Sequence, residues 1–297
     1  MAEVVAAAPQ RVATRPRLRG TALLGTLPFF AYVAIFLIIP TLVVVIGAFA
    51  SNDGGATLEN IKALGNEYIL DAFGRSIALS AISAIVGAVL GAVLAYALAT
   101  ARPDGILRRV VTAAAGVLAQ FGGVTLAFAF LATIGLSGFV TVFLQDHGID
   151  IYSGGVWLFE LPGLTLVYTY FQIPLMVIVF LPALDGIRPQ WREATESLGG
   201  TTWQYWTKVA GPLLGPAFLG STLLLFANAF SAYATAAALV SQGNPIVPLQ
   251  IRSALTSEVI LGQANVGKAM ALGMVIVVSV VMGLYTLLQK RTAKWLG

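Results

Sequence analysis

Side chains able to catalyse a reaction are scarce in this sequence. It contains no Cys, which excludes a thiolate nucleophile, a disulfide framework and a Cys-ligated zinc or iron–sulfur site. Its single histidine, His147, excludes a metal site built from several imidazoles. No charged residue lies inside the long apolar segments, so neither a proton relay nor a pair of acid–base carboxylates is expected there. We therefore expect a protein that is not itself an enzyme.

Uncharged polar side chains do lie inside the apolar segments. Pro174 sits in one of them and cannot donate a hydrogen bond to the Tyr170 carbonyl, so we expect a kink with a freed acceptor. Polar groups in hydrocarbon cost free energy unless they are paired or face water. Hydrogen bonding between helices would explain any single one, whereas the whole set favours a partly hydrated translocation path. The predicted path consists of Gln120, Tyr168, Gln172, Asn228, Ser231 and Thr235.

The composition indicates that a lipid bilayer surrounds these segments. Of the 297 residues, 58% are hydrophobic and 10% charged, against about 25% charged residues in a typical globular chain. Each apolar stretch meets the roughly 20 residues that a helix needs to cross hydrocarbon, and no short alternating segments typical of a β-barrel occur. We expect an all-α membrane protein with six transmembrane helices. The predicted spans are 21–48, 77–99, 110–134, 161–182, 212–239 and 269–289.

The positions of the basic residues predict the orientation of the chain. If the N-terminus is cytoplasmic, 13 of the 17 Lys and Arg residues fall on the cytoplasmic side, because the outer segments hold only four. Both termini are therefore predicted to be cytoplasmic, in the inner or plasma membrane. The basic residues flank apolar segments instead of gathering on one face, which argues against a nucleic-acid partner. The four outer residues are Lys62, Arg75, Arg252 and Lys268.

Two regions follow from this pattern. Residues 1–20 are expected to form a disordered, basic cytoplasmic arm near anionic lipid, and 21–297 a six-helix transmembrane domain. An A-x-A-like site at 48–50 raises a cleaved signal peptide as an alternative. The apolar run 21–48 is longer than the roughly 7–15 residues of a signal peptide's apolar core, which favours a retained span.

Small residues repeat at every fourth position of the second span. In lipid the hydrophobic effect does not drive helix pairing, so a small-residue stripe lets two backbones approach closely. We expect this stripe to pack on another helix, either within the chain or across a subunit interface. The frequency of Gly and Ala in membrane helices is an equally simple explanation. The stripe consists of Ser83, Gly87, Gly91 and Ala95.

The loop between the fourth and fifth spans, about 183–211, carries the most specific pattern. Pro189 near the start and Gly199 past the end predict a short helix. Thr201 or Thr202 can then cap a second short helix that carries Trp203. A helix–glycine–helix elbow of this kind is a rigid knob that suits a groove on a partner.

The run Glu193-Ala194-Thr195-Glu196-Ser197-Leu198-Gly199-Gly200, followed by Val209-Ala210-Gly211-Pro212, resembles the EAA loop of membrane subunits of binding-protein-dependent ABC importers. That motif reads E-A-A, three residues, G, then about nine residues to I-x-L-P. Three positions depart from it: Thr195 for the second Ala, Val209 for the Ile and Gly211 for the Leu. The resemblance covers about 70–290.

This resemblance implies a type I importer permease whose elbow is the coupling helix seated in a cytoplasmic ATPase subunit. It implies two ATPase subunits, a second permease subunit (identical or paralogous) and an extracytoplasmic solute-binding protein. ATP and Mg²⁺ would then sit on the partners, with no cofactor on this chain, which lacks a G-x-x-x-x-G-K-[ST] loop. A solvated helix without a partner is the alternative for the E-A-T-E run. The implied coupling residues are Glu193, Ala194, Gly199, Gly200 and Trp203.

The substrate is less constrained. The runs 171–175 and 227–235 resemble permeases of the polyamine, phosphonate, iron and sulfate group. Acidic residues outnumber basic ones in the outer segments, which favours a cation, although positive-inside topology alone would produce the same imbalance. A polyamine such as spermidine or putrescine is the first expectation and a phosphonate the second. Iron, sulfate or a sugar remain alternatives, as does a channel or scaffold that binds no ATPase.

Overall fold

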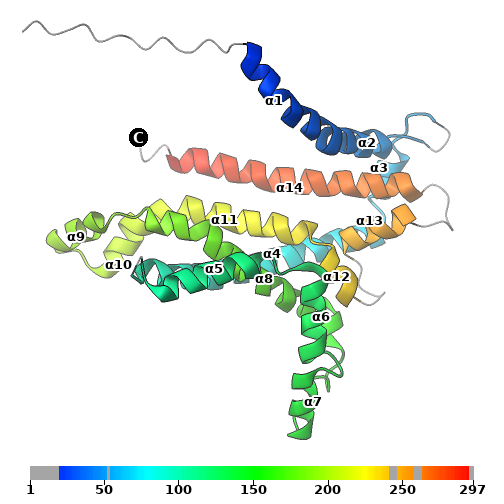
Figure 1. The fold of residues 1–297 in the computed structure, drawn as a ribbon. Helices are drawn as coiled ribbons and strands as arrows, with labels where there is room; N and C mark the ends of the chain where they lie inside the picture. The colour runs from blue at the N-terminus through cyan, green and yellow to red at the C-terminus, as the bar shows by residue number, and fades with distance from the viewer. Residues whose placement is uncertain (1–19, 52–53, 103, 241–245, 257–262, 294–297) are drawn as a thin grey trace, which may run out of the picture. The chain divides into compact units, whose positions relative to one another are not determined.

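A computed structural model describes residues 20–51, 54–102, 104–240, 246–256 and 263–293 (Figure 1). The described residues are almost entirely helical, and their only strand-like pairing is an isolated bridge between Ala50 and Ala56. Six helices are long and apolar enough to cross a membrane. This confirms the all-α class with six spans. The predicted basic arm lies outside the described residues except at Gly20.

The chain divides into two units, residues 1–46 and 47–297. In the first unit lie α1 (Gly20–Val33), the π-helix η1 (Ala34–Ile38) and most of α2 (Ile39–Ala48). Proline explains the π-helix. The ring of Pro40 crowds the carbonyl four residues before it, so the Ile39 N–H bonds one residue further back, to Ala34.

The second unit is built around α4 (Glu67–Thr100), α8 (Leu161–Asp185) and α11 (Gly211–Ser231), which pack against one another. A Cβ added at Gly91 would lie 2.5 Å from Met176 Cβ and 2.7 Å from the Ile173 carbonyl oxygen. One added at Gly87 would collide with Gln172 Cβ. Ser83, Gly87, Gly91 and Ala95 are all buried, so the structure places the small-residue stripe at the contact between α4 and α8.

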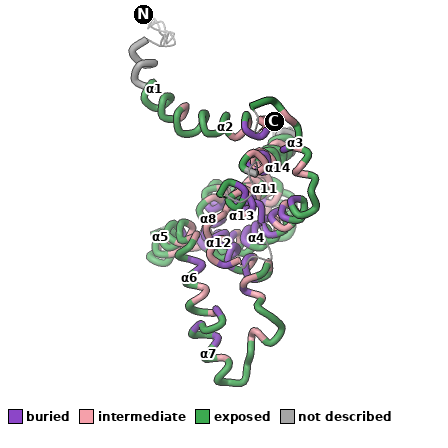
Figure 2. The backbone as a smooth tube through the Cα atoms, turned by 90° about the vertical axis from the view of Figure 1, so that its right-hand side faces the viewer, coloured by how far each residue is buried: buried purple, intermediate pink, exposed green. Residues whose placement is uncertain are grey.

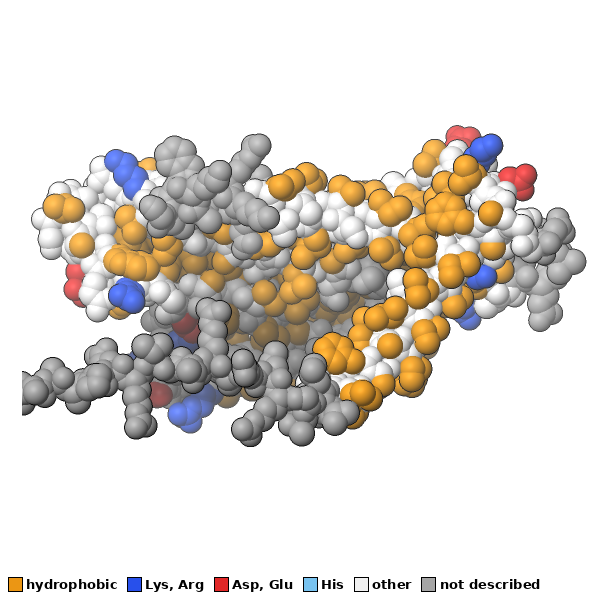
Figure 3. All heavy atoms as spheres, turned by 90° about the horizontal axis from the view of Figure 1, so that it is seen from above, with side chains coloured by type: hydrophobic (Ala, Val, Ile, Leu, Met, Phe, Trp, Pro, Cys, Tyr) orange, Lys and Arg blue, Asp and Glu red, His pale blue; other side chains and the backbone are white. Residues whose placement is uncertain are grey.

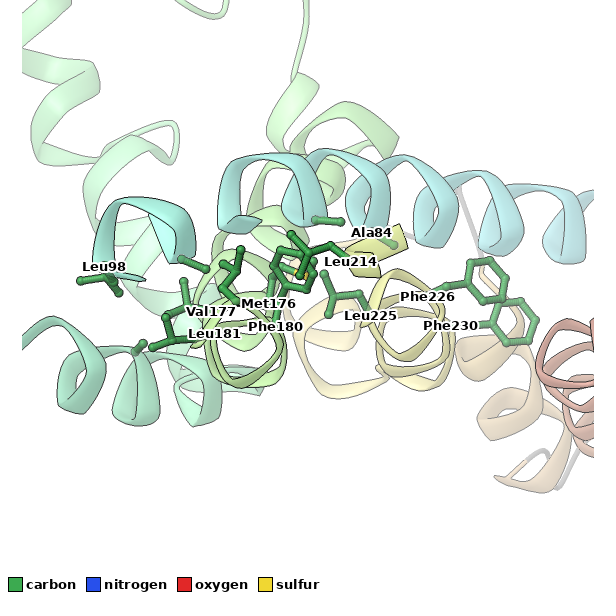
Figure 4. Close-up of a cluster of buried hydrophobic side chains, with 14 residues drawn as sticks. Ala84, Leu98, Met176, Val177, Phe180, Leu181, Leu214, Leu225, Phe226 and Phe230 are labelled. Atoms are coloured by element: carbon green, nitrogen blue, oxygen red, sulfur yellow. The ribbon is translucent and has the colours of Figure 1, made fainter. Parts of the chain in front are cut away.

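Interlocking apolar side chains fill the centre of this unit (Figure 4). Phe180 of α8 crosses the Phe218 ring edge-on at 5.8 Å, and Phe226 stacks on Phe230 at 5.6 Å. Figure 2 shows that burial concentrates on α4, α8, α12 and α13, while α5, α6 and α7 are largely exposed. The buried side chains labelled in Figure 4 are Ala84, Leu98, Met176, Val177, Phe180, Leu181, Leu214, Leu225, Phe226 and Phe230.

The prediction of one continuous helix over 110–134 is wrong. The chain forms α5 (Ile106–Gln120), which packs along α8, and then breaks at Phe121 and Gly122. Beyond the break, α6 (Gly123–Ile134) and α7 (Phe139–Asp146) run across the direction of the bundle (Figure 1). Gly123 has a φ of +71°, a value that glycine adopts without steric cost. By length and composition the third candidate span is Gly123–Asp146.

The loop after α7 folds back onto the end of α6. The Tyr152 hydroxyl donates to the Ile134 carbonyl at 2.6 Å, and its ring stacks on Trp157. Burial raises the pKa of the Tyr152 phenol above its ordinary value, which keeps this donor protonated. This hydrogen bond holds the loop against the end of α6.

The predicted fifth span, 212–239, is also interrupted. Helix α11 ends at Ser231, and the shorter α12 (Ala234–Leu239) begins after two residues that do not continue the helix. The remaining elements are α3 (Glu59–Ala63), η2 (Trp157–Phe159), α9 (Pro189–Ser197), α10 (Thr202–Tyr205), the π-helix η3 (Trp206–Ala210), α13 (Val247–Thr256) and α14 (Gln263–Ala293).

Hydrogen bonds between distant parts of the chain close the end of the second unit opposite α9 and α10. The Asn60 amide donates to the Ala50 carbonyl at 2.9 Å, and Asn265 at the start of α14 donates to the same carbonyl at 3.0 Å. Ser76 Oγ accepts the Val247 N–H of α13 at 2.9 Å. Figure 3 shows one face of the molecule, where the coloured charged side chains lie toward its ends and hydrophobic ones between them.

Candidate functional site

The elbow between α8 and α11 is formed by α9 and α10. Pro189 is the first residue of α9, and the chain reverses through Gly199 and Gly200. Thr201 then caps α10 in a capping box, in which the side chains of Thr201 and Gln204 each accept a hydrogen bond from the other's backbone N–H. The Gln204 N–H donates to Thr201 Oγ1 at 3.3 Å, and the Thr201 N–H donates to Gln204 Oε1 at 2.9 Å. Of the two threonines that could cap this helix, the structure selects Thr201.

The two glycines of the elbow are needed for different reasons. Gly199 has a φ of +76° and open space around it, so only its backbone conformation demands glycine. Gly200 has no positive φ, but an added Cβ would lie 2.6 Å from Thr195 Cγ2 and 2.8 Å from the Thr195 carbonyl oxygen. Together they allow the chain to reverse between α9 and α10.

The elbow exposes apolar side chains beside polar ones. Trp203 is 76% exposed and Leu198 88% exposed, while Glu193 and Ala194 are also on the surface. Leu198 and Trp203 are thus the large apolar side chains that the elbow presents to its surroundings. Leu198 was not singled out from the sequence, although its position between a polar helix and a glycine pair was the available signal.

Three features attach the elbow to the bundle. Arg108 at the start of α5 donates to the Asp185 carboxylate at 2.5 Å. Because Asp185 is the last residue of α8, this contact ties the end of α8, where the elbow begins, to α5. The Trp206 ring packs edge-on against Tyr96 of α4 at a centroid distance of 5.3 Å. The π-helix η3 joins α10 to α11, and its form follows from the proline after Gly211, as in η1.

The six predicted path residues fall into two groups. Tyr168, Gln172 and Thr235 are buried, and each donates a side-chain hydrogen bond to a backbone carbonyl more than 50 residues away. The sequence allowed two explanations for these three residues, a hydrated path or hydrogen bonding between helices. The structure contains the hydrogen bonds. Gln120, Asn228 and Ser231 are exposed on the isolated chain.

Two helix breaks are linked, and we call them the joined breaks: Phe121–Gly122 between α5 and α6, and Ala232–Tyr233 between α11 and α12. Thr235 Oγ1 donates to the Gly123 carbonyl at 3.2 Å, and the Tyr168 hydroxyl donates to the Ala232 carbonyl at 2.7 Å. Irregular backbone at membrane depth is tolerated only where protein or a water-lined cavity satisfies it.

The exposed polar residues gather at the joined breaks. Gln120 immediately precedes the first break, Ser231 immediately precedes the second, and Asn228 lies one turn earlier on α11. Arg252 of α13 reaches the same place, because its guanidinium donates to the Tyr233 hydroxyl at 2.5 Å and lies 5.8 Å from the Tyr233 ring centre. From its position in the sequence, Arg252 is recognisable only as one of the four outer basic residues.

Gln172 ties three helices together. Its Nε2 donates to the Leu225 carbonyl at 2.8 Å, and its Cβ packs against Gly87. Its Oε1 is buried without a hydrogen-bond partner among the described residues. Because the residue is fully buried, it positions α4, α8 and α11 and does not line an open surface.

Replacing Tyr168 with Phe should destabilise the joined breaks. The substitution keeps the buried ring but leaves the Ala232 carbonyl without its donor, at a cost of about 1–3 kcal/mol. The melting temperature of the purified variant should fall. Tyr170→Phe is the matched control, since Tyr170 is exposed. Equal losses in both variants would contradict this role for the Tyr168 hydroxyl.

Within the described residues, no group of three or more His, Asp or Glu side chains could hold a metal ion. The candidate site consists of an elbow that presents apolar side chains, and of polar groups at broken helices.

Comparison with known proteins clarifies this arrangement. No family model matches the chain. It is 28% identical over 198 residues to a ferric transport system permease of Actinobacillus pleuropneumoniae, covering 64% of this chain and 27% of that protein. It is 31% identical over 111 residues to the sulfate permease CysT of Escherichia coli, covering 37% and 36%, respectively. The molybdenum permease ModB of Escherichia coli is 25% identical over 174 residues, covering 59% of this chain and 70% of ModB.

The chain is a homologue of ABC importer permease subunits. Among solved structures, a bacterial ABC transporter that imports alginate matches with a TM-score of 0.74, at 18% identity and over 92% of this chain and 96% of that one. The methionine transporter MetNI matches with a TM-score of 0.56, also at 18% identity, over 73% and 93%. The resemblance to type I importer permeases is thereby confirmed, and the permease fold extends over nearly the whole chain. The chain spans about a third of the length of the ferric and sulfate permeases.

Proposed function

We propose that this chain is a membrane permease subunit of an ABC importer, with both termini cytoplasmic. In this proposal the elbow docks into a cytoplasmic ATPase subunit, and closure of the ATPase pair drives the membrane helices between inward-facing and outward-facing states. The observation that carries it is the elbow itself, in which two exposed apolar side chains, Leu198 and Trp203, flank the glycine pair of an EAA-like loop. ATP and Mg²⁺ would be bound by the partner.

The proposed assembly contains two ATPase subunits, a second permease subunit and an extracytoplasmic solute-binding protein. A second permease subunit would cover part of the exposed apolar surface, and the joined breaks would then lie near the path between the two subunits. The exposed groups at the joined breaks, Gln120, Asn228 and Ser231, are the proposed solute contacts. Tyr168, Gln172 and Thr235 would hold the helices that carry them.

Trp203→Ala should weaken the complex with the ATPase. Loss of a large exposed aromatic anchor costs about 2 kcal/mol or more at a protein interface, which corresponds to about thirtyfold weaker binding. The measurement is recovery of the ATPase with the tagged full-length chain from native membranes in mild detergent. Trp203→Phe should restore most of the recovery. Full recovery of the ATPase with Trp203→Ala would exclude Trp203 as an anchor, and no ATPase with the wild-type chain would exclude the importer.

For the substrate, two classes are supported by different observations. Acidic residues of the proposed outer segments, Glu59, Glu67 and Asp71 among them, support a polyamine. Arg252, held by Tyr233 at the joined breaks, supports an oxyanion instead. Sulfate and molybdenum permeases are among the relatives, as are ferric and thiamine permeases.

A ligand-induced melting screen of the copurifying solute-binding protein distinguishes these classes. The panel is spermidine, putrescine, a phosphonate, ferric iron, sulfate, molybdate, thiamine and sugars. A shift with spermidine or putrescine supports the polyamine, whereas a shift with sulfate, molybdate or a phosphonate supports the oxyanion. A shift with any other ligand overturns both.

A further inference from the structure

An apolar groove of about 440 Å³ lies beside the elbow, between α4, α8 and the start of α11. Apart from Tyr96 and Trp206, every lining residue is glycine or apolar. All of the lining residues belong to helices long and apolar enough to cross a membrane. In the proposed orientation, the groove faces the cytoplasmic half of the bilayer.

Two glycines line the groove. Gly211 is required by η3, because an added Cβ would lie 2.5 Å from the Trp206 carbonyl oxygen. Gly215, one turn later on α11, has no such constraint, since an added Cβ would meet nothing within 4 Å. Among the residues that the structure describes, the space above Gly215 is therefore open to an occupant.

Three basic residues lie close in sequence to the helix segments that line the groove. Arg102 follows the end of α4, Arg188 follows the end of α8, and Lys208 lies two residues after Trp206, and all three are exposed. The nearby Asp185 carboxylate is already bonded to Arg108, which reduces its repulsion of an anion. Basic residues at the cytoplasmic end of an apolar groove between membrane helices match an anionic lipid.

We propose that the groove binds an acyl chain of an anionic phospholipid of the inner leaflet, with its headgroup on Arg102, Arg188 and Lys208. The hydrocarbon that surrounds the spans supplies this occupant directly. Because Trp206 is both a wall of the groove and the first residue of η3, the bound chain supports Trp206 against Tyr96. Lipid occupancy then stabilises the elbow in the position that engages the ATPase. This regulatory role rests on the proposed importer function, whereas lipid binding does not.

Gly215→Leu tests the groove, because its side chain fills the space without backbone strain. Gly116→Leu is the matched control, since Gly116 is exposed on α5 and an added Cβ there also meets nothing within 4 Å. Native mass spectrometry of the full-length chain with phosphatidylglycerol should show retained lipid in the wild type and in Gly116→Leu. Gly215→Leu should lose it. Lys208→Gln should lower the affinity for phosphatidylglycerol about fivefold and leave that for phosphatidylcholine unchanged.

Transport by the reconstituted complex provides the second readout. Adding phosphatidylglycerol to phosphatidylcholine vesicles should raise the uptake rate several-fold with the wild type and Gly116→Leu, but not with Gly215→Leu. Lipid retained equally by Gly215→Leu would overturn the groove assignment. Absence of retained lipid in the wild type would do the same, and would point to a second permease copy or another helix as the occupant. The wild-type chain could also retain lipid, in a way that Gly215→Leu abolishes, and yet never support uptake. That result would support the groove as a lipid site and overturn the importer function instead.

Discussion

Replacing Gly91 with Leu should prevent the second unit from folding stably. An added Cβ alone would lie 2.5 Å from Met176 Cβ and 2.7 Å from the Ile173 carbonyl oxygen. Side chains can change rotamer, but a backbone carbonyl inside α8 cannot move away without breaking the helix. Overpacking of a close-packed interior costs about 1–3 kcal/mol and more where backbone must shift, and a leucine adds three further carbons to the collision.

The measurement is the yield and melting temperature of the full-length chain in detergent. Gly74→Leu is the control on the same helix, because Gly74 is exposed and an added Cβ there meets nothing within 4 Å. We expect Gly74→Leu to match the wild type and Gly91→Leu to aggregate or melt many degrees lower. Equal melting of the two variants would show that α4 and α8 do not pack closely at Gly91.

Gly199→Val should abolish transport while the protein still inserts in the membrane. Gly199 adopts a φ of +76° with no neighbour within 4 Å, so the substitution creates no collision and acts only on the backbone. The left-handed conformation costs about 1–2 kcal/mol for an ordinary residue and more for a β-branched one. The elbow would then relax away from the angle at which α9 and α10 meet, and the ATPase would no longer drive the helices.

Asparagine provides the matched variant at the same position. It tolerates left-handed backbone better than valine does, so Gly199→Asn should keep a substantial part of the uptake rate. Both variants should reach the membrane in wild-type amounts. Wild-type uptake by Gly199→Val would falsify the role of this backbone conformation in coupling, and equal loss in both variants would point to contact with the ATPase surface instead.

The elbow was predictable from sequence because its signals are local. Proline at the first turn, glycine past the last turn and a threonine–glutamine capping box are each set by a few neighbouring residues. The small-residue stripe was readable for the same reason, since every fourth position of a helix shares one face. Its partner, α8, was not readable, because that contact joins residues about 85 positions apart in the chain.

The broken helices illustrate what hydropathy misses. An apolar run of sufficient length predicts a span whether or not the helix is continuous, so 110–134 read as one element. The Gly122-Gly123 pair was the local signal for a break, since paired glycines punctuate helices. Nothing local marks the break after Ser231. Helix α11 ends beside Ala232, whose carbonyl accepts a hydrogen bond from Tyr168, a residue 64 positions earlier in the chain.

The polar residues show the same limit. The sequence shows that all six predicted path residues lie inside apolar segments. Only the structure shows which of them are buried and bonded to other segments, and which are on the surface. That separation depends on three-dimensional neighbours. Gln172 finds its acceptor 53 residues away at Leu225, and Thr235 finds its own 112 residues away at Gly123.

The two asparagines that donate to the Ala50 carbonyl are synthesised at very different times. Asn60 emerges from the ribosome soon after Ala50, but Asn265 follows 215 residues later. At about 5–20 residues per second, the ribosome needs roughly 10–40 s to synthesise that interval. Until Asn265 has been synthesised, Asn60 is the only one of the two asparagines that can donate to the Ala50 carbonyl. A chain stalled before Asn265 would lack this second donor, and would present an incomplete fold to the quality-control proteases of the membrane.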